Sequence, residues 1–157
     1  MDDDPASDDL FRRYHRDIHR YLSRMSGRRE VADDLSQEVF VRALHAFGNG
    51  HGATGHERGW MFSIARSVLA DYRRQHAHED CQVTPAREPS ADGGQQLVVE
   101  LSQSLGRLSD ENREVFLLKE VAGLSYEEIA VACDCTADSV RARLYRTRAA
   151  LRAMLTL

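Results

Sequence analysis

The chain has 157 residues, of which 42% are hydrophobic and 29% are charged. This length allows one ordinary domain or two small ones, and the composition excludes a chain dominated by disorder. The net charge is −4, yet residues 136–157 hold five arginines against one aspartate and carry +4, which predicts one polyanion-binding surface on an acidic body.

The chain opens on an acidic stretch that is followed by an amphipathic helix. Residues 1–9 hold five aspartates, and such a run of like charge predicts a disordered arm. From Leu10 to Met25, hydrophobic residues recur at steps of three and four, which predicts a helix whose apolar stripe faces the core. Gly27 suits the C-terminal cap of that helix.

Two further helices complete the N-terminal half. One begins at about Glu30 and has an acidic polar side, and the next runs from about Trp60 to Gln75. Residues 48–59, between them, contain five glycines and predict a mobile loop. The residues expected to face inward from these two helices are Val31, Leu35, Phe40, Ala43, Leu44, Phe47, Met61, Ile64, Ala65, Val68 and Tyr72.

A segment without hydrophobic periodicity, residues 76–96, divides the chain. Its two prolines, paired glycines and small polar residues predict a flexible linker. Beyond it, leucines outline one helix up to Leu108, and a second begins after Ser109 and ends before Gly123. The sequence therefore predicts an all-α fold of two small helical domains, each with a core that is marginal for its size.

The last two helices are predicted to form a helix-turn-helix. Ser125 and Glu128 form a capping box for the first helix, the turn falls at Asp134, and Thr136 can cap the second helix. A second helix held in this way can enter the major groove of DNA, and the alternative is a helical hairpin with a solvated basic face. Val140 and Leu144 are predicted to point from the second helix back at the first. Other faces of the second helix carry Arg141, Ala142, Tyr145 and Arg146.

Several segments, in this order, resemble the extracytoplasmic-function (ECF) sigma factors. Residues 32–44 resemble the segment that docks on the clamp helices of the RNA polymerase largest subunit, and residues 60–74 resemble the promoter-opening helix. Three later segments resemble the C-terminal domain of the family, namely residues 108–118, 123–130 and 140–146. The resemblance covers nearly the whole chain after the disordered arm at 1–9, and it implies sigma region 2 at 10–75, a linker at 76–96 and sigma region 4 at 97–157.

The resemblance also implies partners and site residues. Core RNA polymerase and promoter DNA are the expected partners, and an anti-sigma factor is expected to control the protein. Asp34, Gln37 and Glu38 lie within one turn of a helix, where a solvated acidic face is the alternative. The expected polymerase-binding residues are these three and Arg42.

Two groups of residues are expected to bind DNA. Those for the downstream promoter element are Trp60, Arg66, Arg73 and Arg74, with Phe62 and Tyr72 as further stacking surfaces unless these aromatic residues belong to the core. Those for the upstream element are Ser139, Arg141, Arg143, Tyr145, Arg146 and Arg148. Asp138, near the start of the same helix, either repels phosphate or accepts a hydrogen bond from a cytosine amine.

The cysteines allow two interpretations. Cys81, Cys133 and Cys135 could supply a redox switch or, with His76 and His78, soft metal ligands. We favour ordinary thiols, because the spacing is unlike that of structural zinc sites, and we predict no metal and no cofactor. An acidic N-terminus and the absence of a long apolar run predict a cytoplasmic protein without membrane insertion.

The sequence therefore predicts a sigma factor that binds core RNA polymerase, recognises the upstream and downstream promoter elements and assists DNA opening. The alternative function is that of a polymerase-independent helix-turn-helix regulator, which would bind duplex operators, usually as a dimer. We do not expect an enzyme, because the chain has no Walker loop, no dinucleotide-binding glycine pattern and no zincin motif.

Overall fold

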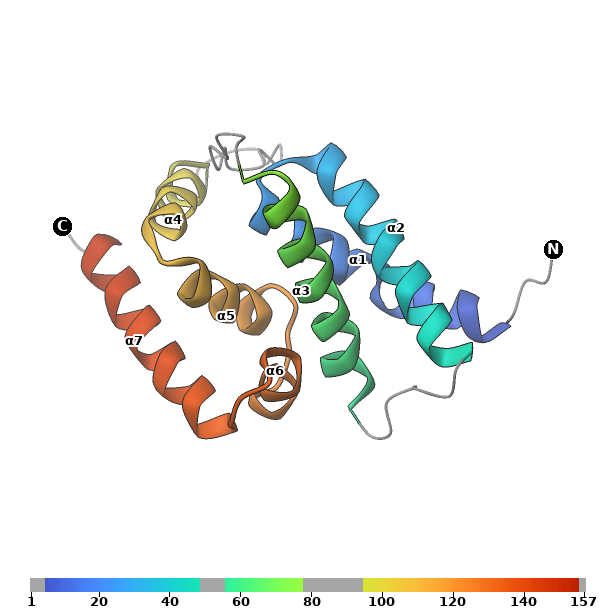
Figure 1. The fold of residues 1–157 in the computed structure, drawn as a ribbon. Helices are drawn as coiled ribbons and strands as arrows, with labels where there is room; N and C mark the ends of the chain where they lie inside the picture. Colours follow the sequence, from blue (N-terminus) through green and yellow to red (C-terminus); the bar gives the residue numbers. More distant parts are fainter. Residues whose placement is uncertain (1–4, 49–55, 78–94, 156–157) are drawn as a thin grey trace.

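The computed structural model describes residues 5–48, 56–77 and 95–155. Within these ranges the chain is all helical and has no strand, which confirms the predicted fold class. The helices α1 to α3 form an N-terminal half and α4 to α7 a C-terminal half, and α3 lies between the two in Figure 1. The helices are α1 Pro5–Ser26, α2 Arg29–Gly48, α3 Glu57–Gln75, α4 Gln95–Arg107, α5 Asp110–Glu120, α6 Tyr126–Cys133 and α7 Ala137–Leu155.

The first helix begins earlier than predicted. Residues 5–9 were expected in a disordered arm, and this prediction is wrong because α1 starts at Pro5. Proline is favoured in the first turn of a helix, where its missing N–H leaves no internal bond unmade. Asp8 lies in that first turn, and Asp9 pairs with Arg13 at 2.8 Å one turn later. Both carboxylates therefore support the helix end on which they lie.

The third helix also begins early, at Glu57 instead of Trp60. The Tyr14 hydroxyl donates a hydrogen bond of 2.8 Å to the Glu57 carboxylate, which also pairs with Arg13 at 3.2 Å. This contact ties the first turn of α3 to α1, so helical structure extends into the segment expected to be a loop. The rest of that loop, residues 49–55, and most of the expected linker, residues 78–94, lie outside the described residues.

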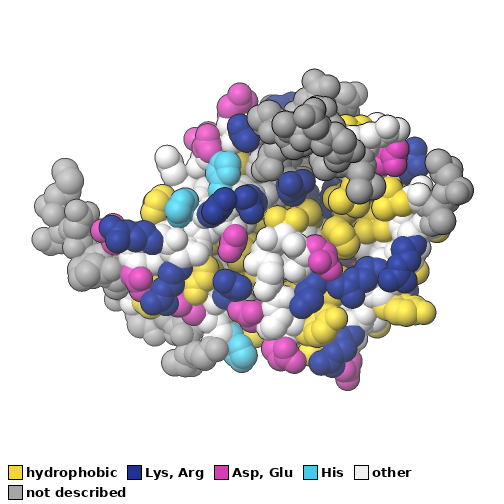
Figure 2. Space-filling view, turned by 180° about the vertical axis from the view of Figure 1, so that it is seen from behind, with side chains coloured by type: hydrophobic (Ala, Val, Ile, Leu, Met, Phe, Trp, Pro, Cys, Tyr) yellow, Lys and Arg dark blue, Asp and Glu magenta, His cyan; other side chains and the backbone are white. Residues whose placement is uncertain are grey.

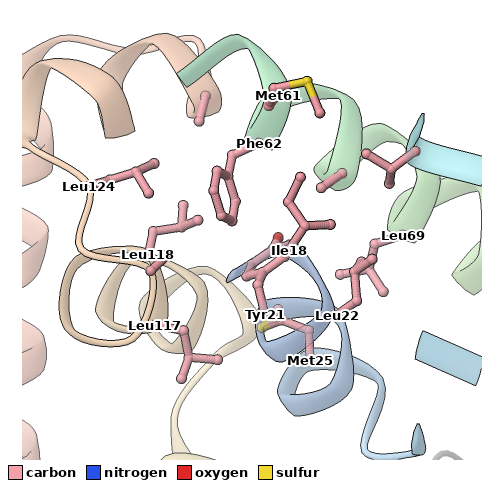
Figure 3. Packing of buried hydrophobic residues seen from close by; sticks show 14 of the residues in the cluster. Ile18, Tyr21, Leu22, Met25, Met61, Phe62, Leu69, Leu117, Leu118 and Leu124 are labelled. Atoms are coloured by element: carbon pink, nitrogen blue, oxygen red, sulfur yellow. The ribbon is translucent and has the colours of Figure 1, made fainter. Parts of the chain in front are cut away.

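Buried residues from both halves form one hydrophobic cluster. Figure 3 shows residues of α1 and α3 beside residues of the C-terminal half. Tyr21 and Phe62 are fully buried with their rings 5.7 Å apart, and Leu118 and Leu124 are fully buried on the other side. Each half alone has a small core, and the contact between them buries apolar surface of both. The sequence predicted two cores but not their junction.

Most, but not all, of the residues predicted to face inward are buried. Leu44 and Phe47 were expected in the core of α2 and instead remain 37% exposed. Their positions belong to the last turns of α2, which extend past the core, and the Phe47 ring packs edge-on against Trp60 at 5.3 Å. The expected core residues that are buried are Leu35, Phe40, Ala43, Met61, Ala65 and Val68.

The closest approach between the halves is made by α3 and α6, at Gly59. A Cβ atom at Gly59 would lie 2.7 Å from the carbonyl oxygen of Glu128 and 3.0 Å from the Cβ of Val131. Only glycine allows two backbones to come this close. Gly59, which the composition placed in a loop, is therefore a helical packing residue.

The predicted caps of the C-terminal half are confirmed. The Ser125 hydroxyl accepts from the Glu128 amide at 3.1 Å, and the Glu128 carboxylate accepts from the Ser125 amide at 2.9 Å, which completes the capping box. Asp134 adopts a left-handed conformation with φ 52° at the turn, and Thr136 accepts from the Ser139 amide at 3.1 Å. These bonds fix the angle at which α7 leaves α6.

Candidate protein and nucleic-acid interfaces

The outer face of α7 is open to solvent. Val140 and Leu144 are buried against the neighbouring helices, as predicted, and this orients the opposite side of α7 outward. Tyr145 is 76% exposed, and Ser139, Arg141 and Arg146 are exposed on the same helix. The helix thus presents hydroxyl, phenol and guanidinium groups in the arrangement that a major-groove reader needs.

Three of the arginines on α7 pair with carboxylates at the surface. Arg141 lies 3.0 Å from Asp138, Arg143 lies 3.7 Å from Glu111, and Arg148 lies 2.7 Å from Glu120. The carboxylate side chains are 93%, 75% and 44% exposed, respectively. Such pairs contribute little to stability, so a phosphate or a base edge can replace them at small cost.

The arginines of α3 have internal partners. Arg66 pairs through its guanidinium with Glu114 of α5, and its Nη1 donates to the Ala132 carbonyl of α6 at 3.2 Å. Arg73, two turns later, donates to the Met25 carbonyl at 3.2 Å and lies 3.7 Å from Asp110. Both side chains therefore connect α3 to the C-terminal half.

Glu114 is the centre of this contact. Its side chain is only 12% exposed, and besides Arg66 it accepts a hydrogen bond of 2.8 Å from the Tyr21 hydroxyl. Burial, together with the nearby Glu114 carboxylate, raises the pKa of Tyr21 well above its usual value. Burial also raises the pKa of Cys133, which lies near Arg66, to about 12. The Tyr21 hydroxyl and the Cys133 thiol are therefore neutral at physiological pH, and they surround the ion pair between Arg66 and Glu114.

The other downstream-element candidates on α3 are divided between core and surface. Phe62 is fully buried, so of its two predicted roles the structure favours core packing over stacking on DNA bases. Trp60 is half-buried against Phe47, and Tyr72 is half-buried and stacked on His76 at 4.2 Å. Arg74 is exposed and pairs with Asp71. Trp60, Arg66, Arg73 and Arg74 thus do not form one continuous open surface in this arrangement.

The polymerase-binding candidates lie together on α2. Asp34, Gln37 and Glu38 are exposed, and Arg42 bridges Glu38 and Asp71, each at 2.9 Å. The hydrogen bond that Arg42 donates to the Glu38 carboxylate, with smaller contributions from Asp71, raises the pKa of Arg42, so this guanidinium is a permanent cation within the acidic patch.

A groove of about 610 Å³ begins beside this patch, between α1 and α2. Phe11 and Val41, at its edges, are 50% and 61% exposed. Neither residue was among the predicted site residues, although Phe11 lies outside the apolar stripe of its helix and a large apolar residue outside that stripe points to an interaction surface. The groove is lined by Phe11, His15, His19, Asp33, Ser36, Gln37, Phe40 and Val41.

The cysteines show no sign of a site in the described part of the chain. Cys133 and Cys135 are free thiols, and Cys81 lies outside the described residues. Across the described ranges, no three His, Cys, Asp or Glu side chains are grouped so that they could hold a metal ion. None of the helices described here combines the length and apolar character needed to cross a membrane.

Comparison with known proteins matches both halves to sigma factors. Residues 10–79 match the family Sigma-70 region 2, and residues 99–151 match the family Sigma-70, region 4. The chain is 36% identical over 127 residues to the ECF RNA polymerase sigma factor SigC of Mycobacterium tuberculosis, covering 76% of this chain and 68% of that protein. It is 30% identical over 161 residues to the RNA polymerase sigma factor YlaC of Bacillus subtilis, covering 95% and 91%.

Solved structures agree on the fold. The sigma factor RpoE of Bartonella quintana, in complex with the anti-sigma factor NepR, has a TM-score of 0.74 at 22% identity, with 96% of each chain covered. CnrH, in complex with the cytosolic domain of CnrY, has a TM-score of 0.71 at 25% identity, with 96% of this chain and 87% of that chain covered. The chain belongs to the ECF family of RNA polymerase sigma factors.

Proposed function

We propose that this sigma factor binds core RNA polymerase through α2, reads the upstream promoter element with α7 and holds the downstream element with α3. Membership of the family makes the chain a transcription initiation factor that directs RNA polymerase to promoters. The observation that carries the residue-level proposal is the open outer face of α7, where Arg141, Tyr145 and Arg146 stand on a helix-turn-helix with both of its helices capped.

The surface of α2 supports polymerase as the partner. An acidic patch alone fits a solvated helix face as well as a binding site. The groove beside Gln37, with exposed Phe11 and Val41 at its edges, adds the apolar surface that a protein interface has at its centre. We propose Asp34, Gln37, Glu38 and Arg42 as its polar rim.

An anti-sigma factor is proposed as a further partner. CnrH, which is 25% identical to this chain, has been solved with the cytosolic domain of CnrY bound. Exposed apolar residues beside charged ones on α1 and α2 fit an amphipathic helix of such a partner. This surface overlaps the proposed polymerase site, so the two partners would compete.

The arrangement of the halves has a consequence for promoter binding. Arg66 and Arg73 are engaged by the C-terminal half, whereas their proposed role requires them to face DNA. We propose that the C-terminal half moves off α3 when polymerase binds, which frees both arginines. The described structure is then the closed form of the free protein, with α7 already open and α3 covered.

The protein is proposed to act where RNA polymerase acts, in the cytoplasm, and to perform no covalent chemistry itself. Its domain limits are proposed to be residues 10–75 for region 2 and 97–157 for region 4, joined by a linker at 76–96.

The function is tested by run-off transcription on a random-promoter library with purified core polymerase, with and without the protein. Transcripts that depend on the protein should share paired upstream and downstream motifs. The Asp34→Arg variant should lose most of this activity and bind polymerase weakly, whereas Glu100→Arg, the same charge reversal at an exposed position of α4, should retain both. If the protein binds duplex DNA without polymerase and supports no transcription, it is a polymerase-independent regulator. Equal loss by both variants would contradict the α2 assignment.

A further inference from the structure

The most basic stretch of the chain runs from its first helix into the start of its second. Residues 10–29 hold seven arginines and one aspartate and therefore carry +6, more than the +4 of the C-terminal segment. None of these arginines is among the residues named for the proposed polymerase or DNA contacts. The polymerase patch lies on α2, and the proposed DNA contacts lie on α3 and α7.

Four of these arginines surround one hollow. The hollow measures about 310 Å³ and is lined by His15, Arg16, His19, Arg20, Ser23, Arg24 and Arg29. Arg16, Arg20 and Arg24 follow one another at four-residue steps on α1, so they lie along one side of the helix, and Arg29 adds a cation from the start of α2. We call these four residues the arginine cradle. Figure 2 shows Lys and Arg side chains with histidines among them over the half of the molecule that contains α1.

The four arginines of the cradle are not paired with carboxylates in the part of the chain that the structure describes. Among the described residues, none of its four guanidinium groups takes part in an ion pair or a side-chain hydrogen bond. Asp33 pairs with His19, which also lines the hollow, at 2.6 Å, and not with an arginine. This differs from α3 and α7, where Arg66, Arg73, Arg141, Arg143 and Arg148 all pair with carboxylates.

Four cations without carboxylates repel one another, and an anion in the hollow would relieve that repulsion. The lining contains guanidinium, imidazole and hydroxyl groups, and no large apolar or aromatic carbon side chain on which a base could stack. Guanidinium groups bind phosphate oxygens in a forked geometry. Arg16 and Arg24 are eight residues apart, which separates them by about 12 Å along the helix, so the row fits several phosphates better than one.

We propose that the arginine cradle binds the phosphate backbone of duplex DNA, as a contact without sequence preference. The chain already carries a helix-turn-helix for duplex DNA, so the ligand chemistry is the same, but the surface is a separate one on the N-terminal half. Phosphate contacts fix position and add salt-dependent affinity without reading bases. The cradle thus gives the N-terminal half a grip on DNA that does not require α3 to be uncovered.

The test uses the full chain and a fluorescently labelled 20-base-pair duplex of scrambled sequence, without polymerase. Binding is measured by fluorescence anisotropy over a range of KCl concentrations, and the slope of log affinity against log salt counts the phosphates engaged. Arg16→Gln/Arg20→Gln should reduce the magnitude of this negative slope by about 2, because each lost phosphate contact reduces it by about 0.9. Arg16→Lys/Arg20→Lys should keep the slope, because it retains both charges.

The matched control changes the net charge equally at another place. Gln103→Glu/Arg107→Gln, on the exposed side of α4, also lowers the net charge by two and should leave the slope unchanged. The proposal is overturned if the wild-type protein does not bind the duplex at low salt, if the cradle variant keeps its slope, or if the control lowers the slope as much as the cradle variant. Because polymerase is absent, none of these results bears on sigma activity.

Discussion

The helices α3 and α7 carry similar side chains in different surroundings. On α3, Arg66 bonds to a carboxylate that is 12% exposed and to a backbone carbonyl of the other half. On α7, Arg141 pairs with Asp138, a carboxylate that is 93% exposed. Burial strengthens an ion pair once both charges are desolvated, whereas water and salt weaken an exposed one. Arginine on α3 therefore holds the structure together, and arginine on α7 is available to a ligand.

This difference between α3 and α7 implies an order for the two DNA-binding steps that we propose. The upstream reader α7 is accessible in the free protein, while α3 becomes accessible only when the halves separate. A protein built in this way can meet duplex DNA before it can hold a melted strand. Polymerase, for which we propose a binding site on α2, is the proposed cause of the separation.

The largest expected effect concerns α7. Arg141→Ala/Arg146→Ala should weaken binding to the upstream element found in the transcription library by about 30-fold or more, since each specific arginine–base contact contributes about 1–3 kcal/mol. Anisotropy with a duplex of that element measures the loss. Arg66→Ala should not weaken this binding, and polymerase affinity should be unchanged in the α7 variant. Equal losses for Arg66→Ala and the α7 variant would remove the distinction between the two helices.

The next effect concerns the ion pair at the junction. Glu114→Gln leaves the guanidinium of Arg66 without its carboxylate, and we expect the free energy of unfolding to fall by about 2–3 kcal/mol, somewhat less than for a fully buried pair because Arg66 is one-third exposed. Glu111→Gln removes the exposed partner of Arg143 and should change stability by about 0.5 kcal/mol or less. Urea unfolding measures the loss of stability in both variants. Equal losses for Glu114→Gln and Glu111→Gln would contradict the distinction between the buried and the exposed ion pair.

A smaller effect is expected at the helix crossing. Gly59→Ala places a methyl group 2.7 Å from the Glu128 carbonyl oxygen, so α3 and α6 must move apart. Overpacking costs about 1–3 kcal/mol and the gain in helix propensity returns up to about 1, so a net loss of about 1–2 kcal/mol is expected. Gly106→Ala, with nothing within 4 Å of the new methyl group, should instead stabilise the protein by about 0.5–1 kcal/mol. Thermal unfolding of the two variants should therefore shift in opposite directions.

The last effect appears only at alkaline pH. Burial raises the pKa of Cys133 from 9.0 to about 12, and burial also raises that of Tyr14 from 10.0 to about 12. A raised pKa means that the folded protein retains protons that the unfolded chain loses, so the stabilisation is complete below pH 9 and is lost as the pH rises toward 12. Urea unfolding at pH 8 to 11 should show this decline. Cys133→Ala should reduce the decline between pH 9 and 10, and an unchanged profile would mean that the thiol is not shielded at the junction.

Local signals predicted the C-terminal half well. The capping box at Ser125, the left-handed turn at Asp134 and the cap at Thr136 depend on contacts within a few residues, and the sequence contains all of that information. The prediction of which residues of α3 and α7 face inward was also largely correct, because a helix that packs on one side imposes its period on the sequence.

Contacts between distant segments could not be predicted in the same way. Nothing near Arg66 in the sequence indicates that Glu114 lies beside it, so a basic residue on a promoter-opening helix was expected to face DNA. Gly59 was taken as a loop residue, since composition does not reveal that a backbone carbonyl approaches it from another helix. The arginine cradle could not be predicted for a similar reason, because its four arginines surround one hollow only where Arg29 of α2 lies beside α1.

The closed form and its opening can be tested by one distance measurement. Spin labels at Ala70 of α3 and Ala149 of α7, both exposed, are introduced as cysteines in a chain with Cys81→Ser, Cys133→Ala and Cys135→Ser, and double electron–electron resonance reports their separation. We predict one short distance in the free protein and a clearly longer one after core polymerase is added. An unchanged distance in a complex that initiates transcription would contradict the account, because α3 would then be covered while the promoter is open.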